Sequence, residues 1–523
     1  MNRRSLFTSW YTRPSAAITD QRPPVRPQSS GLEPYVPSAA MPWDAERVGH
    51  LLRRATFMPT WTEINMMMAV TPSQAVDQLL NAPSQPQAPG IANNVTESLD
   101  GLDITLQNQV KAQWGADMAN FRSWYVNVIQ NAGLTLVEKM AFFWSGHFTS
   151  QFELADDIIQ APLMYRQNQL FRDRAFANLK DLVMDITLDG AMLVYLGGDL
   201  NNASAPNENY GREVLELYTT GLGQYTEGDV QNAARILTGW RIARFSDKPA
   251  PNGMFTTYFD AKNHDIDGKE FMTISFPARD VSTNTEFIVK RDEVRKLVDT
   301  IFEQRQRAVA EFICRKIYRF FVYSNPAATD EAVISAMADL FIANSFEIKP
   351  VMSALLKSAH FFDNANIGAQ IKTPAEFEVG LARVLHGGRD VAGDMKLLDQ
   401  ELFNPPNVSG WPGYRSWITT TTFPVRADVS HGIISAMSDD AAVAFAKGLP
   451  DNTDVTKLTV NIAAVLLPRP LSDQRLANLK TKLIGAAPDY EWPDIINGSP
   501  AGAGPRIRDL LSTIVDLPDF QLC

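Results

Sequence analysis

Three polar side chains on one predicted helix, between residues 207 and 221, have the types and the spacing needed for acid–base chemistry. Asn209, Glu213 and Glu216 follow one another at i, i+4 and i+7, which places an amide and two carboxylates on one face of an α-helix. Two neighbouring carboxylates can bind a divalent cation through their oxygens, or divide acid and base roles when their pKa values differ. This face is therefore the first candidate site.

The same helix also has a purely structural interpretation. Glu208 and Arg212 lie at i and i+4 and can form an ion pair. Asn207 fits an N-cap, and Gly221 fits a C-terminal stop. Because carboxylates are common on solvated surfaces, a solvated polar face is the more frequent outcome for a single acidic helix.

The histidines extend the candidate site, although none stands in a metal-binding motif such as HExxH. His147 ends an aromatic helical stretch, and His264 and Asp265 lie together in a polar loop. If the fold brings them beside Glu213 and Glu216, the five groups are candidate ligands for a divalent metal. The two histidines and the two glutamates are also the candidate catalytic residues. Taken singly, each histidine is more often a packing or hydrogen-bonding residue than a ligand.

Substrate-binding roles are assigned to five further positions. Arg54, Arg212 and Arg235 are suited to holding an anion, because a guanidinium group matches a carboxylate or a phosphate in geometry. Asn209 offers an amide beside the two glutamates, and Trp240 offers a large aromatic surface. Whether these side chains share one cavity depends on the fold.

Two functions from different classes account for these residues. The first, which we favour, is a hydrolase-type enzyme with a histidine and carboxylate site and a divalent metal as its candidate cofactor. The second is a non-catalytic binding or assembly protein, in which the same residues lock helices together through buried polar networks. The Pro- and Gly-rich segment 404–413 would then be a docking element or a rigid turn. Carbohydrate binding through Trp240, Trp411 and Trp417 is a weaker third hypothesis, because tryptophans are more often core or interface residues.

The composition is that of an ordinary folded protein. The chain has 523 residues, 45% of them hydrophobic and 20% charged, which is enough for two or three lobes. A net charge of −11 argues against a general nucleic-acid binder, which needs a basic surface. Cys314, in a helical pattern, is expected to be buried, and Cys523 is expected to be mobile. They predict neither a disulfide framework nor a Cys-based zinc site.

Apolar periodicity predicts a mainly α fold, a multi-helical globular array. A small β-hairpin insertion is expected around 250–290. Its evidence is two short, β-prone stretches flanked by glycines, 255–259 and 271–276.

Two sequence signatures mark helix starts. Thr226 with Asp229, and Thr373 with Glu376, have the spacing of capping boxes. Structure alone explains these residues, so they are not assigned to the site.

Three regions are predicted along the chain: a Pro-rich, disordered or surface-hugging leader at 1–42, a helical core at 43–428, and a helical C-terminal subdomain at 429–523. Arg3 and Arg4 resemble the start of a twin-arginine export signal, but no apolar signal core follows them. This favours the cytoplasm over export. No apolar run reaches the ~18 residues that a transmembrane helix requires.

Seven ordered blocks of the sequence resemble one bacterial family, the "domain of unknown function 1800". The similarity is clearest over about residues 43–428 and weaker toward the C-terminus. The blocks are 50–57 (HLLRRATF), 143–148 (FWSGHF), 207–221, 225–240, 263–265 (NHD), 372–377 (KTPAEF) and 402–413 (LFNPPNVSGWPG).

The resemblance implies a helical fold and a bacterial source. It also implies a protein partner, because such proteins are often encoded beside a family that looks related to the alkaline phosphatase and sulfatase superfamily. Many relatives look exported, and this chain differs from them in lacking an apolar signal core. The resemblance supplies no catalytic residues.

Overall fold

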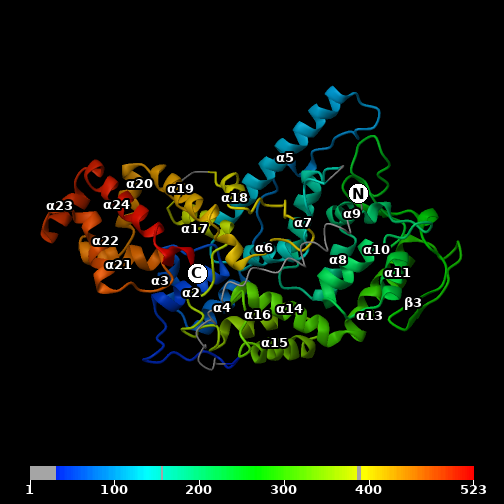
Figure 1. Cartoon of the computed structure of the whole chain (residues 1–523), viewed down its shortest axis with the longest axis horizontal. Coiled ribbons are helices and arrows are strands. Elements are labelled where there is room, and N and C mark those ends of the chain that lie inside the picture. Colours follow the sequence, from blue (N-terminus) through cyan, green and yellow to red (C-terminus); the bar gives the residue numbers. More distant parts are fainter. Residues whose placement is uncertain (1–30, 155–156, 386–389) are drawn as a thin grey trace.

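Helices build almost the whole molecule, as the apolar periodicity predicts. The computed structural model describes residues 31–154, 157–385 and 390–523. In the view of Figure 1, helices α20–α24 form one end of the molecule, and α10, α11, α13 and strand β3 form the other. Helix α5 projects away from the body between them.

The helices in the first half of the chain surround the candidate residues. They are α2 (Ala45–Ala55), α3 (Trp61–Met68), α4 (Pro72–Asn81), α5 (Ile104–Asn131), α6 (Val137–His147), α7 (Ala161–Asp173), α8 (Leu179–Thr187), α9 (Gly190–Leu196), α10 (Glu208–Leu215) and α11 (Glu227–Ile236). Short 3₁₀ turns η1 (Gly90–Asn93), η2 (Gly198–Leu200) and η4 (Ala261–Asn263), and a π-helical turn η3 (Glu216–Thr220), lie among them.

The second half of the chain continues the helical array. Its helices are α12 (Glu286–Val289), the π-helical η5 (Lys290–Arg295), α13 (Lys296–Gln304), α14 (Gln306–Phe321), α15 (Glu331–Ala343), α16 (Ile348–Lys357), α17 (Pro374–Leu385), α18 (Asp394–Leu397), α19 (Thr422–Ser435), α20 (Asp439–Lys447), α21 (Val455–Leu466), α22 (Asp473–Ile484), α23 (Trp492–Asn497) and α24 (Pro500–Val515), with the 3₁₀ turns η6 (Tyr414–Trp417), η7 (Asp489–Glu491) and η8 (Pro518–Gln521).

The two predicted capping boxes are confirmed. Thr226 and Asp229 exchange hydrogen bonds at the start of α11, with distances of 2.8 and 3.2 Å between backbone nitrogen and side-chain oxygen. Thr373 and Glu376 do the same at the start of α17, at 2.9 and 3.1 Å. Each pair satisfies backbone N–H groups that a helix start leaves free.

The predicted β insertion consists of two small antiparallel pairs. Strand β1 (Trp240–Ile242) pairs with β2 (Thr257–Phe259), and β3 (Lys269–Phe271) pairs with β4 (Ile274–Phe276). The stretch 271–276, expected to be one strand, is therefore mostly a tight hairpin. It turns at Met272 and Thr273, both at positive φ (49° and 68°).

The apolar side chains form two clusters. One is built from α2–α4, α6, α8–α11 and α13–α16. The other joins α5, α7 and α17 to the C-terminal helices α19–α24. The boundary predicted at 428/429 falls inside α19, a continuous helix. The predicted C-terminal subdomain thus shares one apolar cluster with helices of the predicted core.

The described part of the predicted leader, 31–42, lies on the surface with defined contacts. Tyr35 N donates to Lys357 O at 2.8 Å, and Ala359 N donates to the carbonyl of Glu33 at 2.7 Å. Arg3 and Arg4 lie outside the described residues.

Two further expectations concern burial. Cys314 is buried, as predicted. The prediction for Cys523 is wrong, because this residue is 2% exposed and its backbone N–H donates to Gln370 O at 2.8 Å. Among the described residues, no helix combines the length and the apolar character that crossing a membrane would require.

Candidate functional site

The helix that carries the first candidate residues changes its winding halfway. It is α-helical over α10 and π-helical over η3, and it ends at Gly221 with φ of 78°. Asn207 caps its start, with its side chain accepting from Tyr210 N at 3.2 Å. The hydroxyls of Thr219 and Thr220 donate to helix carbonyls at 2.7 and 2.8 Å, which supplies partners in the widened turn. The predicted cap and stop are confirmed, and π-helical turns of this kind are frequent at functional sites.

The three residues of the predicted polar face do not all line one cavity. Asn209 and Glu213, on the α-helical part, both line a large cleft. Glu216 begins the π turn, and its carboxylate instead accepts a short hydrogen bond from the Tyr225 hydroxyl. The i, i+4 pair therefore shares one cavity, whereas the i+7 residue is held by its own partner.

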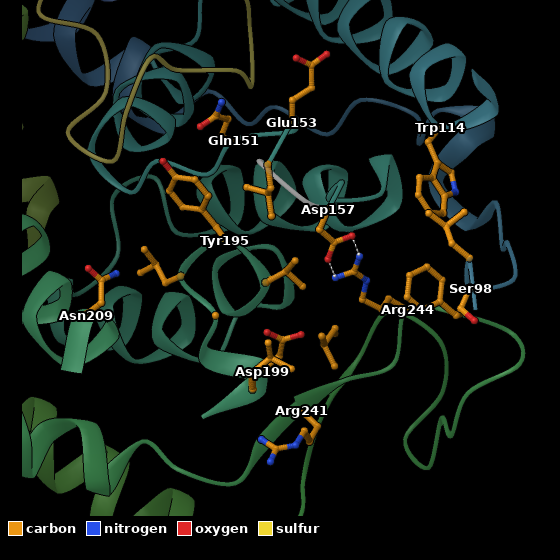
Figure 2. A pocket seen from close by; sticks show the side chains of 18 of the residues that line it. Ser98, Trp114, Gln151, Glu153, Asp157, Tyr195, Asp199, Asn209, Arg241 and Arg244 are labelled. Atoms are coloured by element: carbon orange, nitrogen blue, oxygen red, sulfur yellow. Dashed lines mark hydrogen bonds and ion pairs between the residues drawn. The ribbon is translucent and has the colours of Figure 1, made fainter. Parts of the chain in front are cut away.

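The cleft has a volume of about 1940 Å³ and is formed by segments far apart in sequence. They are α5, the loop around Glu153, the end of α9 with η2, α10, β1, β2, the 244–248 loop and the 404–413 segment. In Figure 2, Asn209 lies toward one side of the cleft and the Asp157–Arg244 pair toward the other, with Tyr195 and Asp199 between them. Trp114, Tyr195, Phe245 and Tyr258 add aromatic surface.

Glu213 is the carboxylate of the cleft with the most altered acidity. Burial, followed by the negative charge of Glu216, raises its pKa from an ordinary 4.5 to about 7, against a smaller opposing effect of Arg212. The side chain is partly exposed to the cleft. At neutral pH it therefore exists in both protonated and ionised forms.

The far side of the cleft holds carboxylates in a different environment. Asp157 is ion-paired to Arg244 by two hydrogen bonds, at 2.6 and 2.8 Å. Asp199 is partly buried, and burial raises its pKa although Arg244 and Arg241 oppose the rise. The cleft thus combines a paired carboxylate with two desolvated ones, an arrangement that can separate proton donor from proton acceptor.

His147 lies elsewhere, in a smaller pocket of about 350 Å³. Its Nε2 lies 3.2 Å from the carbonyl oxygen of Tyr218, and its Nδ1 lies 2.9 Å from Nζ of Lys316. Since a carbonyl only accepts and an ammonium only donates, Nε2 carries the proton and Nδ1 accepts. Burial and the Lys316 charge lower the pKa of His147 well below its ordinary value, so the imidazole is neutral. Burial also lowers the pKa of Lys316 to about 8, which leaves it mostly protonated at neutral pH.

His264 belongs to a buried ionic network at the base of the β insertion. Its Nδ1 lies 2.9 Å from the carbonyl oxygen of Thr238, and its Nε2 lies 3.2 Å from Oε2 of Glu293. Glu293 also pairs with Lys269 at 3.3 Å and with Arg279 at 2.6 Å. Burial raises the pKa of Glu293, but these positive and hydrogen-bonding neighbours outweigh burial and hold it below the ordinary value.

Three more predicted residues pack around this network and the neighbouring helices. Arg235 binds both oxygens of Asp265, at 2.7 and 3.2 Å. Trp240 is 2% exposed and packs against the ring of Phe259. The adjacent Arg241 lines the cleft, and Trp240 does not. Arg212 pairs with Glu227, at 2.6 and 3.1 Å.

Arg54 is 1% exposed and has no contact with either cavity. Its guanidinium donates to the carbonyls of Phe321 and Phe320, at 2.9 and 2.5 Å, and to Sγ of Cys523 at 2.8 Å. These contacts tie α2 to the end of α14.

The predicted composite site is therefore not assembled in one place. Asn209 and Glu213 meet in the cleft, His147 lines the smaller pocket, and His264 with Asp265 joins the ionic network. Across the described residues, no three or more His, Cys, Asp or Glu side chains are grouped so as to hold a metal ion.

Several residues of the two cavities were missed by sequence reasoning. Asp157, Asp199 and Arg244 lie in loops and turns without a motif, so no local signal identifies them. In the sequence, Lys316 does not differ from other lysines in predicted helices. Only its contact with His147 in the fold distinguishes it. The 404–413 segment was singled out, and it runs between the two cavities, with 406–408 lining the cleft and 409 and 411–413 lining the pocket.

Comparison with known proteins supports the resemblance of the seven blocks. A family model described as "Protein of unknown function (DUF1800)" matches residues 50–522, nearly the whole chain. No curated protein and no solved structure matches the chain.

Proposed function

We propose that this chain, which belongs to the DUF1800 family of proteins of unknown function, is a hydrolase-type enzyme that acts in its large cleft. The observation that carries the proposal is the position and the raised pKa of Glu213. Its carboxyl group lies in the cleft wall, desolvated and beside Glu216, with a pKa of about 7. A group that holds its proton at neutral pH and meets solvent in a cleft is suited to protonate a leaving group.

The complementary role, that of the general base, is assigned to Asp157 or Asp199. The Arg244 guanidinium keeps Asp157 in a fixed orientation, at 2.6 and 2.8 Å. Asp199 lies in the same cavity, where either carboxylate can accept a proton from an attacking water. The volume of about 1940 Å³ and the four aromatic side chains favour an extended substrate over a small one. His147 and His264 have no part in this mechanism, and the proposal uses no metal.

The proposal is tested with phenyl esters, phenyl glycosides and phenyl phosphate, with release of phenol as the readout. The weakly acidic phenol needs a proton as it leaves, which is the step assigned to Glu213. We expect hydrolysis of at least one class, with a rate that falls as the pH rises above about 7, because the proton donor is lost. Glu213→Gln should lower kcat by about 10²–10⁴-fold, the usual contribution of a general acid. Glu208→Gln is the matched control, since Glu208 is an exposed carboxylate on the same helix, and it should leave the rate unchanged.

Two outcomes would contradict the proposal. If the protein is active and its Glu213→Gln variant keeps the wild-type rate, Glu213 is not the general acid. Failure to hydrolyse any of the three classes counts against the enzyme and favours the second candidate.

The second candidate is a non-catalytic binding or assembly protein. It is favoured by the ionic network of His264, Glu293, Lys269 and Arg279, in which polar residues join elements through internal contacts. A partner from the adjacent gene, of the alkaline phosphatase and sulfatase type, is its expected binding partner. Affinity purification of the full chain from its native cell distinguishes the two, because stoichiometric recovery of that partner supports assembly.

A further inference from the structure

The pocket at the end of α6 combines polar side chains with several aromatic ones. Lys316 of α14 and His147 of α6 meet there, with 2.9 Å between Nζ and Nδ1. Six of the other lining side chains are aromatic, namely Phe142, Phe143, Phe320, Trp411, Tyr414 and Trp417. Polar side chains, among them Arg319, Gln370 and Gln400, line the pocket as well. The volume of about 350 Å³ is at the lower end of the range for small-molecule sites.

The Lys316 amine has polar contacts but no counter-charge. Its two hydrogen-bond acceptors are the neutral ring of His147 and the carbonyl of Leu217, at 2.9 and 3.3 Å. Among the described residues, no carboxylate forms an ion pair with Lys316, and the one charge that acts appreciably on it is Arg319, which is also positive. A partly buried ammonium without a counter-charge is unfavourable, so it attracts an anion.

The other charged side chains of the pocket do not neutralise the charge of Lys316. Glu376 is the one carboxylate in the lining, and it is occupied by the buried ammonium of Lys139 and by the capping contact to Thr373 N at 2.9 Å. Arg319 adds a second positive charge at the exposed side. One partly buried and one exposed cation are sufficient for a singly charged anion.

We propose that this pocket binds a small aromatic carboxylic acid, with the carboxylate at Lys316 and the ring among Trp411, Trp417 and the phenylalanines. The polar contact fixes the acid group, and the aromatic walls bury the ring. The proposal does not depend on hydrolysis in the cleft, because the two cavities have no lining residue in common.

The test is isothermal titration of the full chain with benzoate, phenylacetate and 3-phenylpropionate. Each acid is compared with the neutral alcohol of the same skeleton. We expect at least one acid to bind about tenfold or more tightly than its alcohol, the size of effect produced by a hydrogen bond to a charged group. This comparison uses the unmodified protein, so it does not depend on how a variant folds.

Two variants locate the site. Lys316→Met keeps the apolar stem and removes the charge, and it should weaken acid binding about tenfold or more. Arg315→Met removes a positive charge from the adjacent position, which pairs with Glu331 at 2.5 Å, and should leave the affinity unchanged. Equal binding of acid and alcohol, no binding by any acid, or unchanged affinity in a folded Lys316→Met variant would each overturn the proposal.

Discussion

Positively charged neighbours decide the acidity of two buried glutamates, Glu293 and Glu376. Glu293 and Glu376 are both buried, yet positive partners hold the pKa of each below the ordinary value. Glu213 has no ion-pair partner among the described residues, so burial, followed by the charge of Glu216, raises its pKa to about 7. Charge compensation therefore separates Glu293 and Glu376 from Glu213, whose pKa lies near neutrality.

The raised pKa of Glu213 makes a prediction about stability. In the unfolded chain the group titrates near 4.5, and in the folded chain near 7, so the native state binds more protons between these values and loses stability as the pH rises through them. Glu213→Gln removes this loss. The difference in the free energy of unfolding, variant minus wild type, should therefore be roughly 1–3 kcal/mol larger at pH 8 than at pH 4.5. Urea unfolding at both pH values measures the difference, and a pH-independent difference would show that the folded-state pKa is ordinary.

At the scale of elements, close contact between α10 and α11 positions the cleft residues. Gly211 permits the approach, because a Cβ at this position would lie 2.7 Å from Val230 O and 2.9 Å from Ala234 N. Both atoms belong to the backbone of α11, so neither can rotate away. The contact thereby fixes the helix that carries Asn209 and Glu213 against its neighbour.

Gly211→Ala should consequently destabilise the protein by about 1–3 kcal/mol through overpacking. Gly228→Ala is the matched control in α11, where the nearest atom to an added Cβ is Thr226 Oγ1 at 3.7 Å. We expect this variant to lose no stability, and to gain a few tenths of a kcal/mol from its higher helix propensity. Thermal denaturation compares the two, and equal melting temperatures would show that α11 moves aside at little cost.

At the scale of the molecule, the C-terminal helices are joined to the body through shared apolar packing. Phe520 is fully buried and lies 5.2 Å from Phe377 of α17 between ring centroids. Cys523 continues this contact through its backbone bond to Gln370. In Figure 1 the C-terminus accordingly lies near the middle of the molecule, beside α2 and α17, rather than at the end formed by α20–α24.

Phe520→Ala should therefore destabilise the protein by about 3–5 kcal/mol and lower hydrogen-exchange protection in α17 and α24 together. Phe287→Ala is the control, since Phe287 is 71% exposed, and its effect should stay within about 0.5 kcal/mol. Faster exchange confined to α19–α24 would show instead that residues 429–523 unfold as an independent domain.

Local signals in the sequence were sufficient to predict the fold class, the family, the two capping boxes and the ends of the 207–221 helix. Each depends on neighbours within a few residues, such as Thr226 with Asp229, and such interactions survive any arrangement of the helices. The burial of Cys314 follows likewise from its place in an apolar stripe.

Tertiary structure alone decided which polar side chains share a cavity. Glu216 is hydrogen-bonded to Tyr225 outside the cleft lining, and long-range contacts direct His147 to Lys316 and His264 to Glu293. The cleft joins Glu213 to Asp157 and Asp199 from loops without any sequence signature. The physical reason is that pairing between charges depends on distances across the fold, and sequence spacing determines such distances only within one helix.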